Sequence, residues 1–280
     1  GGSWQSRGMS TFGWETHTGM GKKFPKELED NLDGALLAFD FDGTLSHMND
    51  DPEAVTMVEA TAKAIGQLAG KGVRVAIVSG RPVDALVRLG ELEGRPGFEN
   101  AVLLGQYGVE RLDMRTGEKR DPAPPSSIGE AKAELEGLIE QFPGVHLEDK
   151  GRALGVHTRT APNPQETLEE MEEQLRDVAE RHDLKVEPGR FVWELRDQAA
   201  DKGDALSELV EEFHPKVVMM AGDDLGDIAA FNYLDSLQDV FTVKVVSGSK
   251  EQPEVAETGD VVCDGPDGLA AWLMHVARQV

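Results

Sequence analysis

The sequence predicts an α/β protein in which a parallel-sheet core is interrupted by an inserted α+β domain. Apolar, strand-like runs alternate with helical patterns near both ends of the chain, as in parallel sheets with right-handed crossovers. The proline-rich stretch 121–127 interrupts this alternation. We therefore expect a core of 27–117 with 198–280, an insert of 118–197 and a loosely structured segment of 1–26.

The core elements follow from apolar runs, which predict strands, and from helical spacing of apolar residues. Asp51-Pro52 supplies an N-cap and a first-turn proline for the first helix, which Gly70 and Gly72 end. The predicted strands are 35–41, 73–79, 101–105, 216–224, 240–246 and 261–263, and the predicted helices are 52–69, 82–91, 201–213, 227–234 and 268–280.

The insert contains two amphipathic helices and several strands without a parallel rhythm. Residues 145–149 and 153–160 predict an antiparallel pair, and 184–195 predict a hairpin that turns at Pro188-Gly189. An insert of about 80 residues is large enough for its own small core. The cleft between two such domains is the expected place for a ligand.

Charge and cysteine content exclude several classes of function. With 52 acidic and 28 basic residues the formal charge is −24, so neither nucleic acid nor an anionic membrane is an expected partner. The single cysteine excludes an intrachain disulfide framework and a cysteine-based zinc site. No apolar run approaches the length of a membrane span, and we expect a cytoplasmic enzyme.

Polar residues gather where the predicted core strands end, which is where open α/β sheets bind ligands. These residues are Asp40, Asp42, Ser79, Gly80, Arg81, Asp223, Asp224 and Asp227, with Lys202 at a helix start. Converging carboxylates need a cation, and oxygen ligands favour Mg²⁺. A serine, a lysine and loop N–H groups beside that cation form a phosphate cradle. Together these features suit phosphoryl transfer through an aspartyl-phosphate, with one aspartate attacking and the other managing protons.

Four motifs, DFDGTL, VSGR, DKGDAL and AGDDLGD, occur in an order that resembles the haloacid dehalogenase phosphatase superfamily. The resemblance implies a Rossmann-like core of that type with an inserted α+β cap. It also implies Asp40 as nucleophile and Asp42 as general acid/base, whose carbonyl ligates Mg²⁺. The other implied roles are phosphate binding by Thr44, Ser79 and Lys202, substrate binding by Gly80 and Arg81, metal binding by Asp223, and support of the metal by Asp224 or Asp227.

The insert resembles the cap of trehalose-6-phosphate phosphatases in LEDKGRALGVHTR (147–159) and GRFVWELR (189–196). LLGQYGVE (103–110) in the core is also similar. The resemblance implies that four cap residues face the sugar: Lys150, His157, Arg159 and Glu194. Tyr107 stands where a histidine is common in that family, a difference that bears on sugar contacts. LGDI replaces the more usual T-D-E after the double aspartate, which leaves Asp227 as the main substitute for a carboxylate near the metal.

Several of these residues also have plain structural interpretations. Asp224 is equally suited to cap the next helix, and Asp227 to stabilise its first turn. His157 is compatible with an exposed position on an alternating strand. Lys150 and Arg159 are compatible with edge-strand charges that discourage aggregation.

The sequence thus predicts a Mg²⁺-dependent sugar-phosphate phosphatase that releases trehalose from trehalose 6-phosphate, with a possible association with a trehalose-phosphate synthase. The alternatives are a phosphatase for sucrose phosphate or a glycosyl-phosphoglycerate, a phosphosugar mutase, and a non-catalytic binding subunit. Net phosphate release distinguishes a phosphatase from a mutase.

Overall fold

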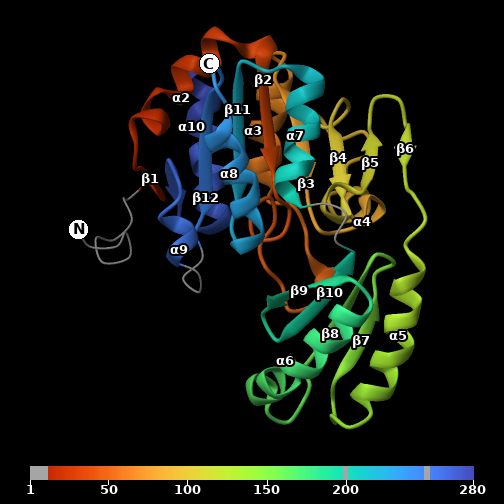
Figure 1. The fold of residues 1–280 in the computed structure, drawn as a ribbon. Helices are drawn as coiled ribbons and strands as arrows, with labels where there is room; N and C mark the ends of the chain where they lie inside the picture. The colour runs from red at the N-terminus through yellow and green to blue at the C-terminus, as the bar shows by residue number, and fades with distance from the viewer. Residues whose placement is uncertain (1–11, 198–200, 249–252) are drawn as a thin grey trace. The chain divides into compact units, whose positions relative to one another are not determined.

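A computed structural model describes residues 12–197, 201–248 and 253–280. The chain divides into two compact units, Gly1–Asp121 with Ala200–Val280, and Pro122–Ala199. The first unit is built on a nine-stranded sheet with the order β1-β13-β12-β11-β2-β3-β4-β5-β6 (Figure 1). Its strands are β1 (Trp14–Thr16), β2 (Ala35–Phe39), β3 (Arg74–Val78), β4 (Val102–Gly105), β5 (Glu110–Asp113), β6 (Lys119–Arg120), β11 (Val217–Gly222), β12 (Phe241–Ser247) and β13 (Val261–Cys263).

The central strands, β13 to β4, are all parallel, as the alternation of strands and helices predicts. β1 pairs antiparallel with β13 at one edge, and β5 and β6 continue antiparallel from β4 at the other. The helices of this unit are α2 (Gly19–Asp30), α3 (Glu59–Ala69), α4 (Val83–Leu89), α7 (Lys202–Phe213), α8 (Ile228–Ser236), α9 (Pro253–Ala256) and α10 (Gly265–Gln279), with short 3₁₀ turns η1 (Leu32–Gly34), η2 (Pro52–Ala54), η3 (Gln106–Gly108) and η4 (Leu225–Asp227).

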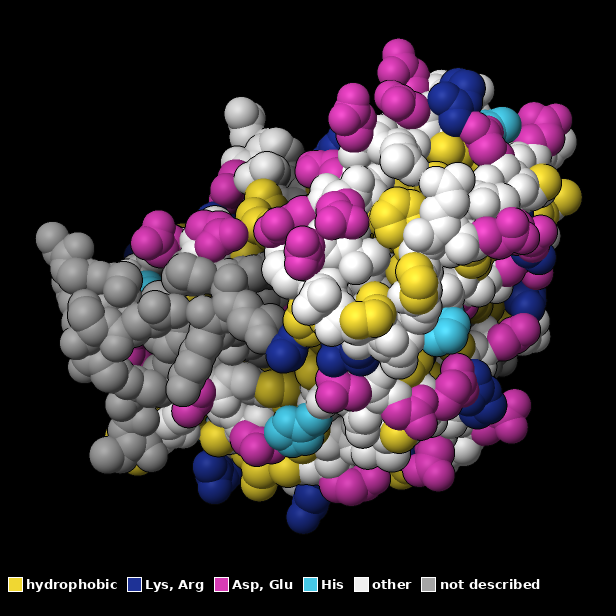
Figure 2. All heavy atoms as spheres, turned by 90° about the horizontal axis from the view of Figure 1, so that it is seen from below, with side chains coloured by type: hydrophobic (Ala, Val, Ile, Leu, Met, Phe, Trp, Pro, Cys, Tyr) yellow, Lys and Arg dark blue, Asp and Glu magenta, His cyan; other side chains and the backbone are white. Residues whose placement is uncertain are grey.

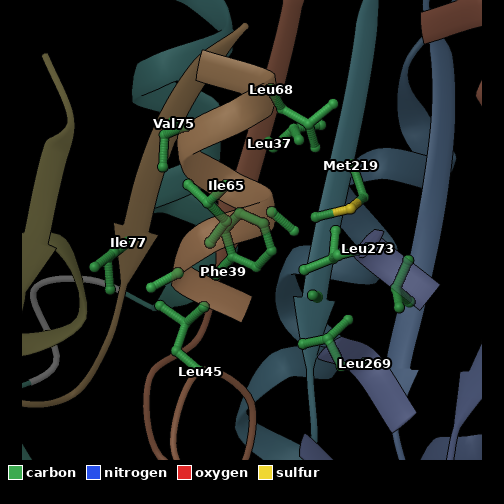
Figure 3. Close-up of a cluster of buried hydrophobic side chains, with 14 of the residues drawn as sticks. Leu37, Phe39, Leu45, Ile65, Leu68, Val75, Ile77, Met219, Leu269 and Leu273 are labelled. Atoms are coloured by element: carbon green, nitrogen blue, oxygen red, sulfur yellow. The ribbon is translucent and has the colours of Figure 1, made fainter. Parts of the chain in front are cut away.

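Alternate residues of the central strands enter two separate cores on opposite faces of the sheet. Leu37 and Phe39 pack with residues of α2, α3, α4 and α10. Figure 3 shows part of this cluster, with Ile65 and Leu68 of α3 and Leu269 and Leu273 of α10. Leu36 and Ala38 pack with residues of α7, α8 and α9 on the other face. Because both faces are covered, the strands are apolar throughout rather than alternating. This doubly covered sheet fixes where each strand ends, and therefore where the polar residues gather.

The N-terminal segment differs from the prediction that residues 1–26 are loose. Residues 1–11 lie outside the described part, but β1 and most of α2 fall within 12–26. Thr18 caps α2 by accepting a hydrogen bond from the Gly21 N–H. Phe24 is fully buried and its ring lies 5.5 Å from that of Trp272 on α10. The prediction is wrong for 12–26 because this packing involves the far end of the chain.

The second unit is a four-stranded sheet in the order β7-β8-β10-β9 with two helices. Its elements are α5 (Ser126–Ile139), β7 (His146–Asp149), β8 (Ala153–His157), α6 (Pro164–Arg181), β9 (Leu184–Gly189) and β10 (Val192–Asp197). The β9–β10 hairpin exists, but Gly189 pairs with Val192, so it turns at Arg190 and Phe191 rather than at Pro188-Gly189. Pro188 is tolerated in β9 because this strand lies at the sheet edge.

One helix boundary also differs from the prediction. The helix expected from 52 begins at Glu59, because Asp51 caps the separate turn η2 instead. No helix in the described ranges is both long and apolar enough to cross a bilayer. Acidic side chains are spread over the face of the molecule in Figure 2, with fewer basic ones between them, in keeping with the charge of −24.

Candidate active site

The core motifs meet at the carboxyl ends of three adjacent parallel strands. Asp40 directly follows β2, Ser79 follows β3 and Asp223 follows β11, and β2 lies between the other two strands. Main-chain hydrogen bonds extend the sheet to these residues, from the Asp40 N–H to the Ala221 carbonyl at 2.8 Å and from the Ser79 N–H to the Leu104 carbonyl at 2.9 Å. The sheet therefore sets the backbone positions of Asp40 and Ser79, and Asp223 directly follows the last residue of β11.

Three buried carboxyl groups share this end of the sheet. Oxygen atoms of Asp40, Asp223 and Asp227 lie within 4.8 Å of one another. Lys202, at the first position of α7, donates hydrogen bonds to Oδ1 of Asp40 at 2.9 Å and to Oδ1 of Asp227 at 2.8 Å. One buried ammonium thus faces three buried carboxyl groups, so the cluster has an excess of negative charge when all three are ionised.

The pKa values of the three carboxyl groups and of Lys202 are shifted by this excess of negative charge and by burial. Burial raises the pKa of Asp40, although the neighbouring Lys202 opposes this shift. Burial and the charge of Asp40 raise the pKa of Asp223 well above its usual value. Burial disfavours the charged form of Lys202, but Asp227 and Asp40 outweigh it and raise the pKa of this lysine well above its usual value. The cluster would take up protons unless another cation enters it.

Asp223 has the feature expected of a metal ligand. Its Oδ1 atom is buried and makes no hydrogen bond in the described structure. An unsatisfied buried carboxylate oxygen is costly, and a hard cation with oxygen ligands would satisfy it. Asp40 and Asp223 therefore fit Mg²⁺. Gly43 allows this arrangement, because its φ is +76° and a methyl group in its place would come within 2.1 Å of Asp223 Oδ2.

Asp227 and Asp224 have different surroundings. Asp227 is fully buried, and its Oδ2 accepts hydrogen bonds from the N–H groups of Asp223 at 3.0 Å and Asp224 at 3.3 Å. Because Oδ1 binds Lys202, both oxygens of Asp227 are engaged. Asp224 is outside the three-carboxyl group and caps η4 through the Gly226 N–H at 2.9 Å. Asp227 thus holds both the lysine and the turn that carries Asp223.

Asp42 and Arg81 form a direct ion pair. The guanidinium donates from Nε to Asp42 Oδ2 and from Nη2 to Asp42 Oδ1, both at 2.7 Å, and Nη2 also reaches the Pro52 carbonyl at 3.0 Å. Such two-point pairing holds a carboxylate firmly. If Asp42 passes protons to and from the substrate, this ion pair has to open during turnover.

The predicted phosphate ligands lie near the same strand ends, with one unexpected partner. Ser79 is buried, and its Oγ accepts a hydrogen bond from the Arg81 N–H at 3.0 Å. The Thr44 hydroxyl is buried 3.1 Å from Ser247 Oγ, which donates to the Gly43 carbonyl at 2.8 Å. The Thr44 hydroxyl therefore supports the loop after β2. Ser247 was not predicted, although it is a polar residue at the end of an apolar strand, like Asp40 and Ser79.

The second unit places two of the predicted sugar-binding residues, His157 and Glu194, on one face of its sheet. Leu154, Val156 and Trp193 belong to the core formed with α5 and α6, so the alternate positions face away from the helices. On the face that carries no helix, His157 Nε2 lies 3.5 Å from Glu148 Oε2. A methyl group at Gly155 would come within 2.9 Å of the same nitrogen, so this glycine gives the histidine room.

The other predicted residues of this unit are also paired. Lys150 donates a hydrogen bond to Glu194 at 3.0 Å, and the Arg159 guanidinium lies 5.2 Å from the centre of the Phe191 ring. Glu148 was missed by the sequence analysis, although strand alternation places it on the face of His157 and Glu194. The helix-free face thus carries an ammonium, carboxylates and an imidazole, groups that hydrogen-bond with hydroxyls.

Comparisons with solved structures agree with this fold. The structure resembles a haloacid dehalogenase-like hydrolase from Bacteroides thetaiotaomicron, with a TM-score of 0.62, 15% identity and coverage of 86% of this chain and 99% of that one. The Candida albicans trehalose-6-phosphate phosphatase C-terminal domain gives a TM-score of 0.78 at 22% identity, covering 95% and 99%. The predicted fold class is therefore confirmed: the protein has the fold of haloacid dehalogenase-type hydrolases.

Sequence similarity defines the family more narrowly. The model of the trehalose-phosphatase family matches residues 38–265. A probable trehalose-phosphate phosphatase of Sinorhizobium fredii is 31% identical over 78% of this chain and 80% of its own length. The Mycobacterium tuberculosis trehalose-phosphate phosphatase is 30% identical over 86% of this chain but only 61% of its own length. The chain belongs to the trehalose-phosphatase family, as its motifs indicate.

Proposed function

We propose that this protein hydrolyses trehalose 6-phosphate to trehalose and phosphate in a Mg²⁺-dependent reaction that proceeds through an aspartyl-phosphate on Asp40. Membership of the trehalose-phosphatase family supports the substrate. The observation that carries the mechanism is a buried aspartate held by a buried lysine, next to a carboxylate oxygen of Asp223 without a hydrogen-bond partner. Nothing else in the described core combines a nucleophile with such a cation site.

The residues of the core divide the chemistry between them. Lys202 holds Oδ1 of Asp40, which leaves Oδ2 to attack phosphorus while the bond between phosphorus and the sugar oxygen breaks. Once released from Arg81 and protonated by solvent, Asp42 gives this proton to the leaving sugar oxygen. It later takes a proton from the water that attacks the aspartyl-phosphate, while the bond between phosphorus and Asp40 breaks and phosphate is released. Ser79 and Lys202 hold the phosphate. Bound by Asp40, Asp223 and the Asp42 carbonyl, Mg²⁺ supplies positive charge that offsets the repulsion between aspartate and phosphate.

The metal assignment predicts a pH-dependent stabilisation by Mg²⁺. Burial raises the pKa values of Asp40, Asp223 and Asp227 above those of the unfolded chain. Groups with raised pKa values contribute stability at low pH that is lost as the pH rises above about 4. Without metal, this cluster therefore destabilises the fold most at high pH. We expect added Mg²⁺ to raise the melting temperature more at about pH 8 than at about pH 5.

The measurement is thermal unfolding in EDTA and in Mg²⁺ at both pH values. Asp223→Asn is the matched variant, since it keeps the shape of the side chain and removes a proposed ligand. Its Mg²⁺-induced shift should be much smaller than that of the parent. An equal shift in parent and variant would contradict the assignment of Asp223 as a metal ligand.

The polar face of the second unit is proposed to bind the sugar, which makes this unit the specificity domain. Arg159→Ala and Glu194→Ala should each lower kcat/KM for trehalose 6-phosphate by roughly ten- to a hundredfold, because a buried sugar hydroxyl would lose its partner. The loss on p-nitrophenyl phosphate should be far smaller. Glu172→Ala removes a carboxylate from the outer surface of α6 and serves as the control. Equal losses on both substrates would show that Arg159 and Glu194 support the catalytic centre or the fold.

A panel of sugar phosphates tests the choice of substrate. Trehalose 6-phosphate should be hydrolysed with the highest kcat/KM, ahead of sucrose phosphate and glycosyl-phosphoglycerates. Formation of a rearranged sugar phosphate without phosphate release would identify a mutase instead. Association with a trehalose-phosphate synthase stays an expectation from the family resemblance.

A further inference from the structure

The turn η3, between β4 and β5, has an unusual backbone. Gln106 and Tyr107 have φ values of 50° and 60°, and Gly108 follows with a φ of 102°. Two consecutive non-glycine residues in the left-handed region are strained, each at a cost that surrounding contacts must offset. Such conformations occur preferentially at sites where a side chain has to be aimed. The contacts around η3 show which part of the protein its side chains approach.

Main-chain hydrogen bonds fix η3 to the loop proposed to hold phosphate. The Tyr107 N–H donates to the Ser79 carbonyl at 3.0 Å, and the Gln106 N–H donates to the Arg81 carbonyl at 2.9 Å. Just after the turn, Oε1 of the buried Glu110 accepts a hydrogen bond from the Val83 N–H at 2.9 Å. These hydrogen bonds therefore fix the position of the turn relative to Ser79 and Arg81, the residues on either side of Gly80.

The opposite side of η3 packs against the helix that begins with Lys202. A methyl group at Gly108 would come within 2.8 Å of the Ala205 side chain on α7. The turn thus lies between the phosphate loop and the helix that presents the lysine. Both neighbours belong to the core unit, and both contribute groups to the proposed phosphate site.

The Tyr107 ring extends over the phosphate loop. A methyl group at Gly80 would come within 2.8 Å of Tyr107 Cζ and 2.9 Å of its hydroxyl oxygen, so the polar end of the ring covers this glycine. Tyr107 is only half-buried. A phenol is a neutral donor and acceptor that matches a sugar hydroxyl, whereas Lys202 is proposed to offset the phosphate charge.

We propose that Tyr107 is a substrate-binding residue whose hydroxyl group hydrogen-bonds to the sugar ring next to the phosphate. This inference rests on the proposed sugar-phosphate phosphatase function. It assigns part of the sugar recognition to the core unit. The left-handed backbone of η3 and its hydrogen bonds to Ser79 and Arg81 keep the phenol at this place.

The test compares Tyr107→Phe with Tyr107→His. The first variant keeps an aromatic ring and removes only the hydroxyl group, and the second restores a ring that can hydrogen-bond. We expect Tyr107→Phe to lower kcat/KM for trehalose 6-phosphate about tenfold more than for p-nitrophenyl phosphate, chiefly through KM. Tyr107→His should recover part of this loss. Melting temperatures of both variants should stay close to that of the parent.

Equal losses on the two substrates, or no loss in Tyr107→Phe, would overturn the inference. The proposed function is judged separately, by the turnover of trehalose 6-phosphate in the parent protein. Should the parent prefer another sugar phosphate, the same ratio measured with that compound decides whether Tyr107 contacts the sugar. A fall in melting temperature that accompanies equal losses would assign Tyr107 a structural role only.

Discussion

Asp40→Asn is expected to fold like the parent and to lose turnover of trehalose 6-phosphate by at least about a thousandfold. The amide is a poor nucleophile, so no aspartyl-phosphate forms at this position. The fold should persist because Lys202 keeps its hydrogen bond to Asp227 at 2.8 Å. Losing one of three crowded carboxyl groups also removes repulsion from the buried cluster.

The measurement is phosphate release by purified protein, with the melting temperature recorded for each variant. Asp30→Asn removes an exposed carboxylate from α2 and is the matched control, expected to retain parent activity. Beryllium fluoride should inhibit the parent by mimicking the phosphorylated aspartate. Activity of Asp40→Asn within tenfold of the parent would exclude Asp40 as the nucleophile.

Lys202→Met is expected to have the largest effect on stability. The substitution keeps much of the buried stem but leaves Asp40 and Asp227 without the ammonium that lies 2.9 and 2.8 Å from them. Removing one partner of a buried ion pair costs about 3–5 kcal/mol. We expect a decrease of that size in the free energy of unfolding, measured by urea denaturation in EDTA at neutral pH.

Measuring Lys202→Met in a second protein, the Asp40→Asn variant, separates the effect of charge from that of packing. In Asp40→Asn protein, Lys202→Met should cost less, because one fewer buried carboxylate is left unpaired. Lys71→Met, at an exposed lysine, should change stability little. Identical costs of Lys202→Met in both backgrounds would mean that Lys202 contributes packing rather than charge compensation.

The sequence was sufficient to predict the parallel core because each strand and helix has a local pattern. It also placed Asp40, Ser79 and Asp223 together, since parallel strands bring their carboxyl ends to one edge of the sheet. Local pattern could not reveal pairings between distant segments. Thr44 and Ser247 are 203 residues apart, and their hydrogen bond depends on the order of the strands.

The sequence also did not predict which side chains contact one another. The Asp42–Arg81 ion pair joins two residues that had been assigned separate roles, because sequence spacing does not show which charges meet. The direction of the Tyr107 ring depends on the left-handed backbone angles of Gln106 and Tyr107. These angles could not be predicted from the sequence, because Gln and Tyr rarely adopt them. The N-terminal strand and helix were missed because their stability comes from contacts with β13 and α10.

The proposed hydrolysis is tested most directly by reaction of the purified parent protein with trehalose 6-phosphate, followed by quantification of both products. We expect equal molar amounts of trehalose and phosphate in Mg²⁺, none in EDTA, and recovery when Mg²⁺ is restored. Failure to release phosphate from trehalose 6-phosphate in Mg²⁺, or undiminished release after exhaustive removal of metal, would contradict the proposed hydrolysis.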